Sequence, residues 1–89
     1  MESNKNKREK ERKIIGEFLK NRREQMGRSQ EDLAEFLKYG VRTIEAVETG
    51  KFDYDLSILL NICEALEIKP FFVPLEDEPG FENLIYNKN

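Results

Sequence analysis

Residues 29–50, SQEDLAEFLKYGVRTIEAVETG, constrain this fold most, because they predict two short helices joined by a tight turn. Ser29 can cap the first helix, and Asp32 stands where a capping box needs an acid. Gly40 is an acceptable N-cap for the second helix, and Gly50 is a typical C-terminal stop. Apolar residues recur at helical spacing, with Leu33, Ala34 and Leu37 in the first helix and Ile44 and Val47 in the second. The second helix therefore has one buried stripe and a free outer face.

These residues resemble the phage-repressor helix-turn-helix family, the Cro and lambda-repressor-like DNA-binding domains. The family pattern is Ser-Gln, an acidic pair, Leu-Ala, a turn, Thr-Ile and, two residues later, an apolar residue, Glu, any residue and Gly. This chain follows it without a gap at Ser29, Gln30, Glu31, Asp32, Leu33, Ala34, Thr43, Ile44, Val47, Glu48 and Gly50. The resemblance extends from about Ile15 to Ile68 and implies an all-α fold, a compact lambda-repressor-like domain of four to five helices.

Three positions depart from the family. Lys38 stands where the family often has glycine, so we expect a slightly different turn, on which the aim of the second helix depends. Glu67 replaces another family glycine, so we expect the fourth helix to end less sharply. Phe36 occupies a position that is usually polar, and we expect it to pack against the N-terminal helix or a partner.

The chain divides into a charged extension (1–13), the helix-turn-helix domain (14–68) and a C-terminal strand with an acidic tail (69–89). Two hypotheses fit the extension. It either continues the first helix in solvent without burying any side chain, or it forms a basic arm that contacts DNA phosphates. Four helices are predicted at about 14–27, 30–37, 41–49 and 56–66, with Asp55 as the cap of the last. The apolar face of the first consists of Ile14, Ile15, Phe18, Leu19 and Met26.

Lys69-Pro70 ends the helical pattern, and the next residues predict a short β-strand that carries Phe71, Phe72, Val73 and Leu75. A lone strand leaves its backbone groups unpaired, so we expect it to pair with the same strand of a second copy across a two-fold axis. This arrangement resembles that of some antitoxin-type members of the family, whose C-terminal strands pair between subunits. The alternative is a monomer in which Phe71 and Val73 fold back onto the first and fourth helices. Within the tail, Phe81, Leu84, Ile85 and Tyr86 could form a docking turn or helix.

Composition argues against catalysis and against membrane insertion. The 89 residues include no histidine and one cysteine, Cys63, which reads as a buried small hydrophobe in an apolar helix face. No P-loop or dinucleotide fingerprint is present, and no apolar run is long enough to cross a bilayer. We therefore expect no enzyme activity, no metal, no cofactor, no small-molecule substrate and a cytoplasmic location without a signal peptide.

Charge is distributed unevenly around a net value of −3. Residues 1–28 hold ten Lys or Arg and five Glu, a balance of +5, whereas residues 29–89 hold five Lys or Arg and thirteen Asp or Glu, a balance of −8. DNA binding would therefore depend on a local basic face, and the acidic half would limit non-specific affinity.

The resemblance implies that the helix over 41–49 enters the major groove of double-stranded DNA. Its outward residues, the candidates for base contacts, are Val41, Arg42, Thr43, Glu45 and Ala46. Arg42 is the best base reader, because a guanidinium can pair with O6 and N7 of guanine. Gln30 matches the family glutamine that supports this helix and touches phosphate or base. Candidates for phosphate contacts are Arg28, Lys38, Thr49 and Lys51.

These features predict a sequence-specific DNA-binding regulator, a repressor that acts as a homodimer. One alternative is an antitoxin, in which the same dimer also holds a toxin protein through the acidic half. The other is a protein–protein adapter that no longer contacts DNA, which the acidic balance and Glu45 on the reading face keep open.

Overall fold

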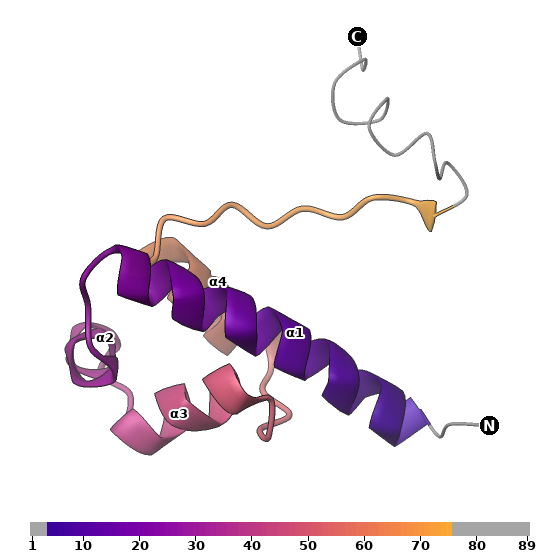
Figure 1. Cartoon of the computed structure of the whole chain (residues 1–89), viewed down its shortest axis with the longest axis horizontal. Helices are drawn as coiled ribbons and strands as arrows, with labels where there is room; N and C mark the ends of the chain where they lie inside the picture. Colours follow the sequence, from indigo (N-terminus) through magenta and orange to yellow (C-terminus); the bar gives the residue numbers. More distant parts are fainter. Residues whose placement is uncertain (1–3, 76–89) are drawn as a thin grey trace, which may run out of the picture.

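The computed structural model describes residues 4–75, with side chains from residue 7, and within them the chain is all-α. Four helices follow one another: α1 (Asn4–Gln25), α2 (Gln30–Leu37), α3 (Val41–Thr49) and α4 (Leu56–Ala65). The long α1 crosses the whole molecule, with α3 packed along one side of it and α2 near its C-terminal end (Figure 1). The predicted α2 and α3 have the expected bounds, and the all-α prediction is confirmed.

The core forms where the buried faces of the four helices meet. Its fully buried residues are Leu19, Leu33, Ala34, Ile44, Val47, Ile62, Cys63, Ala65 and Leu66. Burial raises the pKa of the Cys63 thiol, so this cysteine is a neutral part of the core. Helices α1 and α3 lie close together at Gly16, where a Cβ atom would lie 2.3 Å from the carbonyl oxygen of Glu48. Only glycine fits this crossing.

Each of the four helices ends at a residue in the left-handed conformation, namely Gly27, Lys38, Gly50 and Glu67. At Lys38 (φ 64°) the next amide, of Tyr39, donates to the carbonyl of Ala34 at 2.9 Å, which closes α2 with a Schellman motif. Lys38 thus adopts the left-handed backbone conformation that the family glycine provides. In this conformation the side chain of Lys38 causes steric strain that glycine would avoid.

The fourth helix ends in the same way. Glu67 has φ 58°, and the amide of Ile68 donates to the carbonyl of Cys63 at 2.8 Å. Our expectation of a less sharp end was therefore wrong. Ile68 packs against the core, and this contact together with the hydrogen bond holds Glu67 in its unfavourable conformation.

The charged extension continues the first helix, as one of our two hypotheses predicted, and α1 begins at Asn4, about three turns before Ile14. Its charged extension is not wholly solvated: Arg12 is half-buried, and its Nε donates to the carbonyl of Gly50 at 3.1 Å. The predicted apolar face is only partly right, because Leu19 is buried while Ile14 and Phe18 are 70% and 59% exposed.

The chain leaves α4 as an extended segment, residues 69–74, which runs along the side of α1 opposite α3 (Figure 1). It pairs with no strand among the described residues. The pairing of Phe71, Phe72, Val73 and Leu75 with a second copy stays a prediction. The predicted docking of Phe81, Leu84, Ile85 and Tyr86 lies outside the described residues.

Candidate DNA-binding surface

The first helix of the pair, α2, begins with a complete capping box. The Asp32 amide donates to Ser29 Oγ, and the Ser29 amide donates to Asp32 Oδ2, each at 2.9 Å. Hydrogen bonding of the Asp32 carboxylate to Ser29, with its backbone amide first and then with its side chain, holds the pKa of this carboxyl below its usual range. The carboxylate therefore stays charged at the positive end of the α2 dipole.

The turn and the start of α3 are held by α4. Tyr39 is half-buried against the core, and its hydroxyl accepts a hydrogen bond from Asn61 Nδ2 at 2.8 Å. Gly40 is the N-cap of α3, with extended backbone and no side-chain cap. The start of α3 is thus held against α4, and the amides of Val41 and Arg42 donate to no described residue, which leaves them to an acceptor outside the chain.

The outer face of α3 contains the residues that we predicted to read bases. Val41 is 36% exposed, Arg42 and Glu45 are exposed, and Thr43 and Ala46 are half-buried. The opposite face of the helix consists of Ile44, Val47 and Glu48, all buried. Arg42 and Glu45 make no side-chain hydrogen bond within residues 7–75, so both are available to a ligand.

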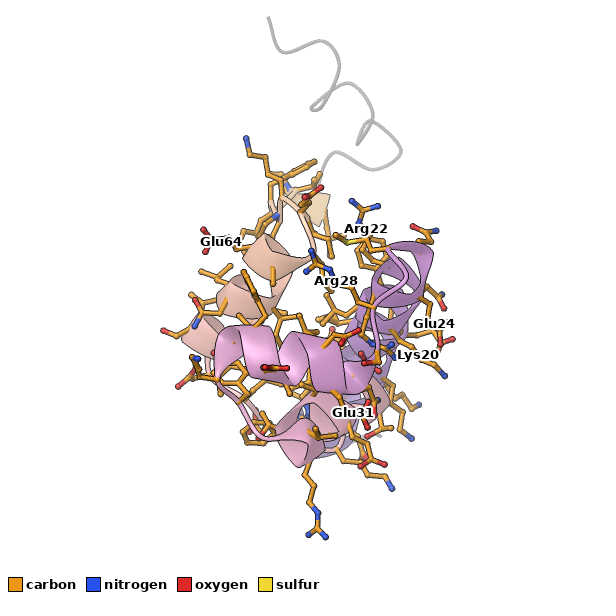
Figure 2. All side chains as sticks on the ribbon, turned by 90° about the vertical axis from the view of Figure 1, so that its left-hand side faces the viewer. Lys20, Arg22, Glu24, Arg28, Glu31 and Glu64 are labelled. Atoms are coloured by element: carbon orange, nitrogen blue, oxygen red, sulfur yellow. The ribbon has the colours of Figure 1, made fainter. Side chains whose placement is uncertain are left out.

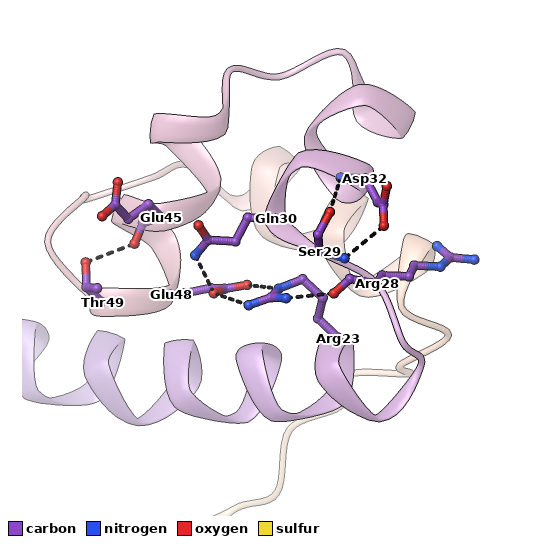
Figure 3. Close-up of polar contacts among 8 residues, drawn as sticks. All are labelled: Arg23, Arg28, Ser29, Gln30, Asp32, Glu45, Glu48 and Thr49. Atoms are coloured by element: carbon purple, nitrogen blue, oxygen red, sulfur yellow. Dashed lines mark hydrogen bonds and ion pairs between the residues drawn. The ribbon is translucent and has the colours of Figure 1, made fainter.

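A buried ion pair supports α3 from behind. Arg23 of α1 donates from Nε to Glu48 Oε2 at 2.7 Å and from Nη2 to Oε1 at 3.0 Å (Figure 3). Its Nη1 donates to the carbonyl of Arg28 at 2.7 Å, so one guanidinium joins α1, α3 and the start of α2. The hydrogen bonds to Glu48 raise the pKa of Arg23 and outweigh the opposite effect of burial.

Gln30 completes this cluster. Its Nε2 donates to Glu48 Oε1 at 2.9 Å, which directs the side chain from α2 toward the back of α3 (Figure 3). Gln30 is half-buried, so its amide oxygen can still reach a ligand. The position implied by the family resemblance, a support for α3, is where the structure places it.

Sequence reasoning missed Arg23. It lies four residues after the buried Leu19, and this helical spacing places it on the core side of α1. An arginine on a core face facing the Glu48 position was a signal for a buried pair.

The four candidates for phosphate contacts have different surroundings. Lys38 and Lys51 are exposed. The Thr49 hydroxyl donates to the carbonyl of Glu45 at 3.0 Å within its own helix. Arg28 lies on the side of α2 that faces α4, away from α3 (Figure 2). Lys38 and Lys51 are therefore the better placed of the four.

Arg28 is engaged elsewhere in the fold. Its Nη1 donates to the carbonyl of Ala65 at 3.2 Å, and its guanidinium lies 5.9 Å from the centre of the Phe36 ring. Of our two expectations for Phe36, packing against the N-terminal helix is wrong, because this residue is 67% exposed beside Arg28, and packing against a partner stays a prediction.

Two further arginines donate hydrogen bonds to the C-terminal ends of other helices. Arg12 donates to Gly50 at the end of α3, and Arg22 Nε donates to the carbonyl of Leu66 at 2.9 Å, at the end of α4. Cations at helix C-termini satisfy free carbonyls and the negative end of the helix dipole. Much of the basic charge of residues 1–28 therefore serves the fold rather than a ligand.

Residues 7–75 contain no group of acidic, histidine or cysteine side chains that could hold a metal ion. No helix within the described part of the chain is long and apolar enough to cross a membrane.

Two short helices at a fixed turn, the second supported from behind and open in front, define the helix-turn-helix class of DNA-binding domain. Residues 19–73 match the family model described as Helix-turn-helix, of the Cro/C1 type, and the chain belongs to this family. The family resemblance that we inferred from the sequence is thereby confirmed, and the chain is a DNA-binding regulator of this type. No curated protein sequence matches the chain significantly.

Proposed function

We propose that this chain is a sequence-specific transcriptional repressor that acts as a homodimer on a near-palindromic DNA site. The observation that carries the proposal is the two-sided α3, whose buried face is fixed by the Arg23–Glu48 pair while Arg42 and Glu45 stand free. A rigid helix with an unoccupied outer face suits direct reading of base edges.

In this proposal α3 lies in the major groove and Arg42 pairs with a guanine. Val41 touches a thymine methyl group, while Thr43, Ala46 and Glu45 line the same groove. Gln30 contacts the DNA beside the start of α2. Lys38 and Lys51 contact phosphates, which position the domain without specifying sequence.

Fluorescence anisotropy with the chain's own upstream DNA and with scrambled DNA, across a salt series, tests the proposal. We expect Arg42→Ala to weaken binding to the upstream DNA by at least about 30-fold, because each bidentate base contact is worth about 1–3 kcal/mol and a homodimer loses two of them. Lys20→Ala is the matched control, since it removes one exposed positive charge from α1, outside the helix-turn-helix. Equal losses for both variants, or equal binding to both DNAs, would refute sequence-specific reading through α3.

A second candidate keeps the DNA-binding dimer and adds a toxin protein held by the acidic C-terminal half. The charge balance of −8 in residues 29–89 favours a basic partner. Co-purification with the product of the adjacent gene tests this candidate. An adapter without DNA contacts would instead bind neither DNA in the anisotropy experiment.

A further inference from the structure

An apolar groove lies between α1, α4 and the extended segment that follows α4. Its volume is about 510 Å³, and its lining is almost wholly apolar. Nine large apolar side chains are exposed within residues 7–75, and five of them line this groove: Phe18, Leu56, Leu60, Phe71 and Phe72. Ile14 lies one helical turn before Phe18 on the same side of α1. Exposed apolar surface gathered in one place is typical of a binding site rather than of a solvated face.

The segment that borders the groove also lacks backbone partners. Residues 69–73 are extended (Figure 1), and their C=O groups and, apart from Pro70, their N–H groups make no hydrogen bond to other described residues. Phe72 is 91% exposed and Leu75 is 82% exposed, so aromatic and aliphatic side chains project beside the hollow. One surface therefore has both an apolar protrusion and an apolar hollow, next to an unpaired strand edge.

We propose that this groove is one half of a two-fold interface between two copies of the chain. The 69–73 segments of the two copies pair as antiparallel strands, and Phe72 of each copy enters the groove of the other beside Phe18 and Leu60. This inference deepens the proposed homodimer and rests on it, because it assigns residues of α1 and α4 to the interface.

A second copy is the occupant that fits, because it supplies both missing parts in equal number. Its own 69–73 segment provides the strand edge, and its own Phe72 provides an apolar side chain for the hollow. A surface that contains both a protrusion and its matching hollow is self-complementary, as an isologous two-fold contact requires. Within the chain's own residues 76–89, Glu76, Asp77 and Glu78 suit a wet rim, whereas Phe81, Leu84, Ile85 and Tyr86 are a competing occupant that the experiment below distinguishes from a second copy.

The position of the groove is compatible with DNA binding. The extended segment and α3 lie on opposite sides of α1 (Figure 1). A two-fold axis directed from the segment toward α3 leaves both α3 helices on one side of the dimer. Two half-sites on one duplex can then be read together.

Sedimentation equilibrium of the full chain without DNA tests the interface. We compare the wild type with Phe18→Glu and Leu60→Glu, whose parent side chains are 59% and 41% exposed, so the folded monomer tolerates the change. Phe36→Glu is the matched control, because this phenylalanine is 67% exposed on α2 and outside the groove. We expect a dimer for the wild type and the control, and self-association weakened at least 100-fold in both groove variants with unchanged circular dichroism.

Amide hydrogen exchange at residues 71–73 provides a second readout. If these amides are protected from exchange in the wild type and lose that protection in Phe18→Glu, strand pairing depends on occupation of the groove. A wild-type monomer at all concentrations would overturn the inference, and the groove would then be covered by the chain's own last residues or by another protein. A Phe18→Glu variant that remains dimeric would remove the groove from the interface and leave the dimer itself in place.

Failure of this inference is separable from failure of the proposed function. Self-association is measured without DNA, and base reading is measured with Arg42→Ala on DNA. A groove-dependent dimer that binds no DNA refutes only the repressor, whereas specific DNA binding by a dimer indifferent to Phe18→Glu refutes only the groove.

Discussion

Removing the negative charge of Glu48 should damage this fold more than any change on its surface. The side chains of Arg23 and Glu48 are 7% and 5% exposed, and their closest N–O distance is 2.7 Å. Glu48→Gln keeps the shape of the side chain but leaves the guanidinium of Arg23 buried without a counter-charge. Loss of one member of a buried ion pair costs about 3–5 kcal/mol.

This cost is large relative to what a domain of this size can lose. At about 0.05–0.15 kcal/mol per residue, the whole free energy of unfolding is on the order of 4–13 kcal/mol. Because about 1 kcal/mol shifts the Tm of a small domain by roughly 4–8 °C, we expect Glu48→Gln to melt at least about 12 °C lower. Urea unfolding followed by far-UV circular dichroism gives the free energy directly.

A double-mutant cycle provides the control. Arg23→Met and Glu48→Leu should each be strongly destabilising alone, since each leaves a buried charge unpaired. The double variant should lose much less than the sum, because apolar side chains of similar size can replace a buried pair at little cost. Single variants that each lose under about 1 kcal/mol, with additive effects, would refute the reasoning, because the pair would then be worth no more than an exposed one.

Three further changes test the local geometry. Gly16→Ala should lower stability by about 1–3 kcal/mol despite its better helix propensity, because its Cβ would lie 2.3 Å from a backbone oxygen of Glu48; an unchanged thermal melt would contradict this. Lys38→Gly should raise the free energy of unfolding by about 1 kcal/mol by relieving a left-handed φ of 64°, and no gain in urea unfolding would count against it. The lowered pKa of Asp32 means that its contribution is present above the unfolded-state pKa and is lost as the pH falls through the folded-state pKa. The stability gap between wild type and Asp32→Asn should therefore narrow in acid, and a gap that is constant with pH would exclude the linkage.

The helix-turn-helix could be predicted from sequence because its signals are local. Ser29 and Asp32 cap α2 through their own backbone neighbours, and Gly50 ends α3 by a conformation that glycine adopts without strain. The start of α1 could be predicted only as one of two alternatives. Residues 4–13 have no apolar stripe, yet no Gly or Pro interrupts them, so the helix continues. Arg12 then anchors it to Gly50 through a contact between residues 38 positions apart.

The candidate site was predictable in outline but not in its supports. The exposure of Arg42 and Glu45 follows from the buried positions of Ile44 and Val47 on the same helix. The contacts of a long arginine side chain are harder to predict from the sequence, because they depend on which hydrogen-bond acceptor the fold brings near it. Arg28 looked like a phosphate ligand in sequence, whereas the folded chain places the Ala65 carbonyl and the Phe36 ring beside it.

Four arginines are bound within the domain, and this limits the positive charge that is available to attract DNA. Arg12, Arg22, Arg23 and Arg28 all donate to carbonyls or a carboxylate of the domain, within a chain whose net charge is already −3. Few cations therefore remain near α3 to attract phosphates, and binding to random DNA should be weak with a shallow salt dependence. Base contacts by Arg42 and the pairing of two half-sites would then supply a larger share of the total affinity. If the proposed homodimer forms, its assembly would then determine whether the DNA is occupied, because one domain alone would have little electrostatic attraction for phosphates.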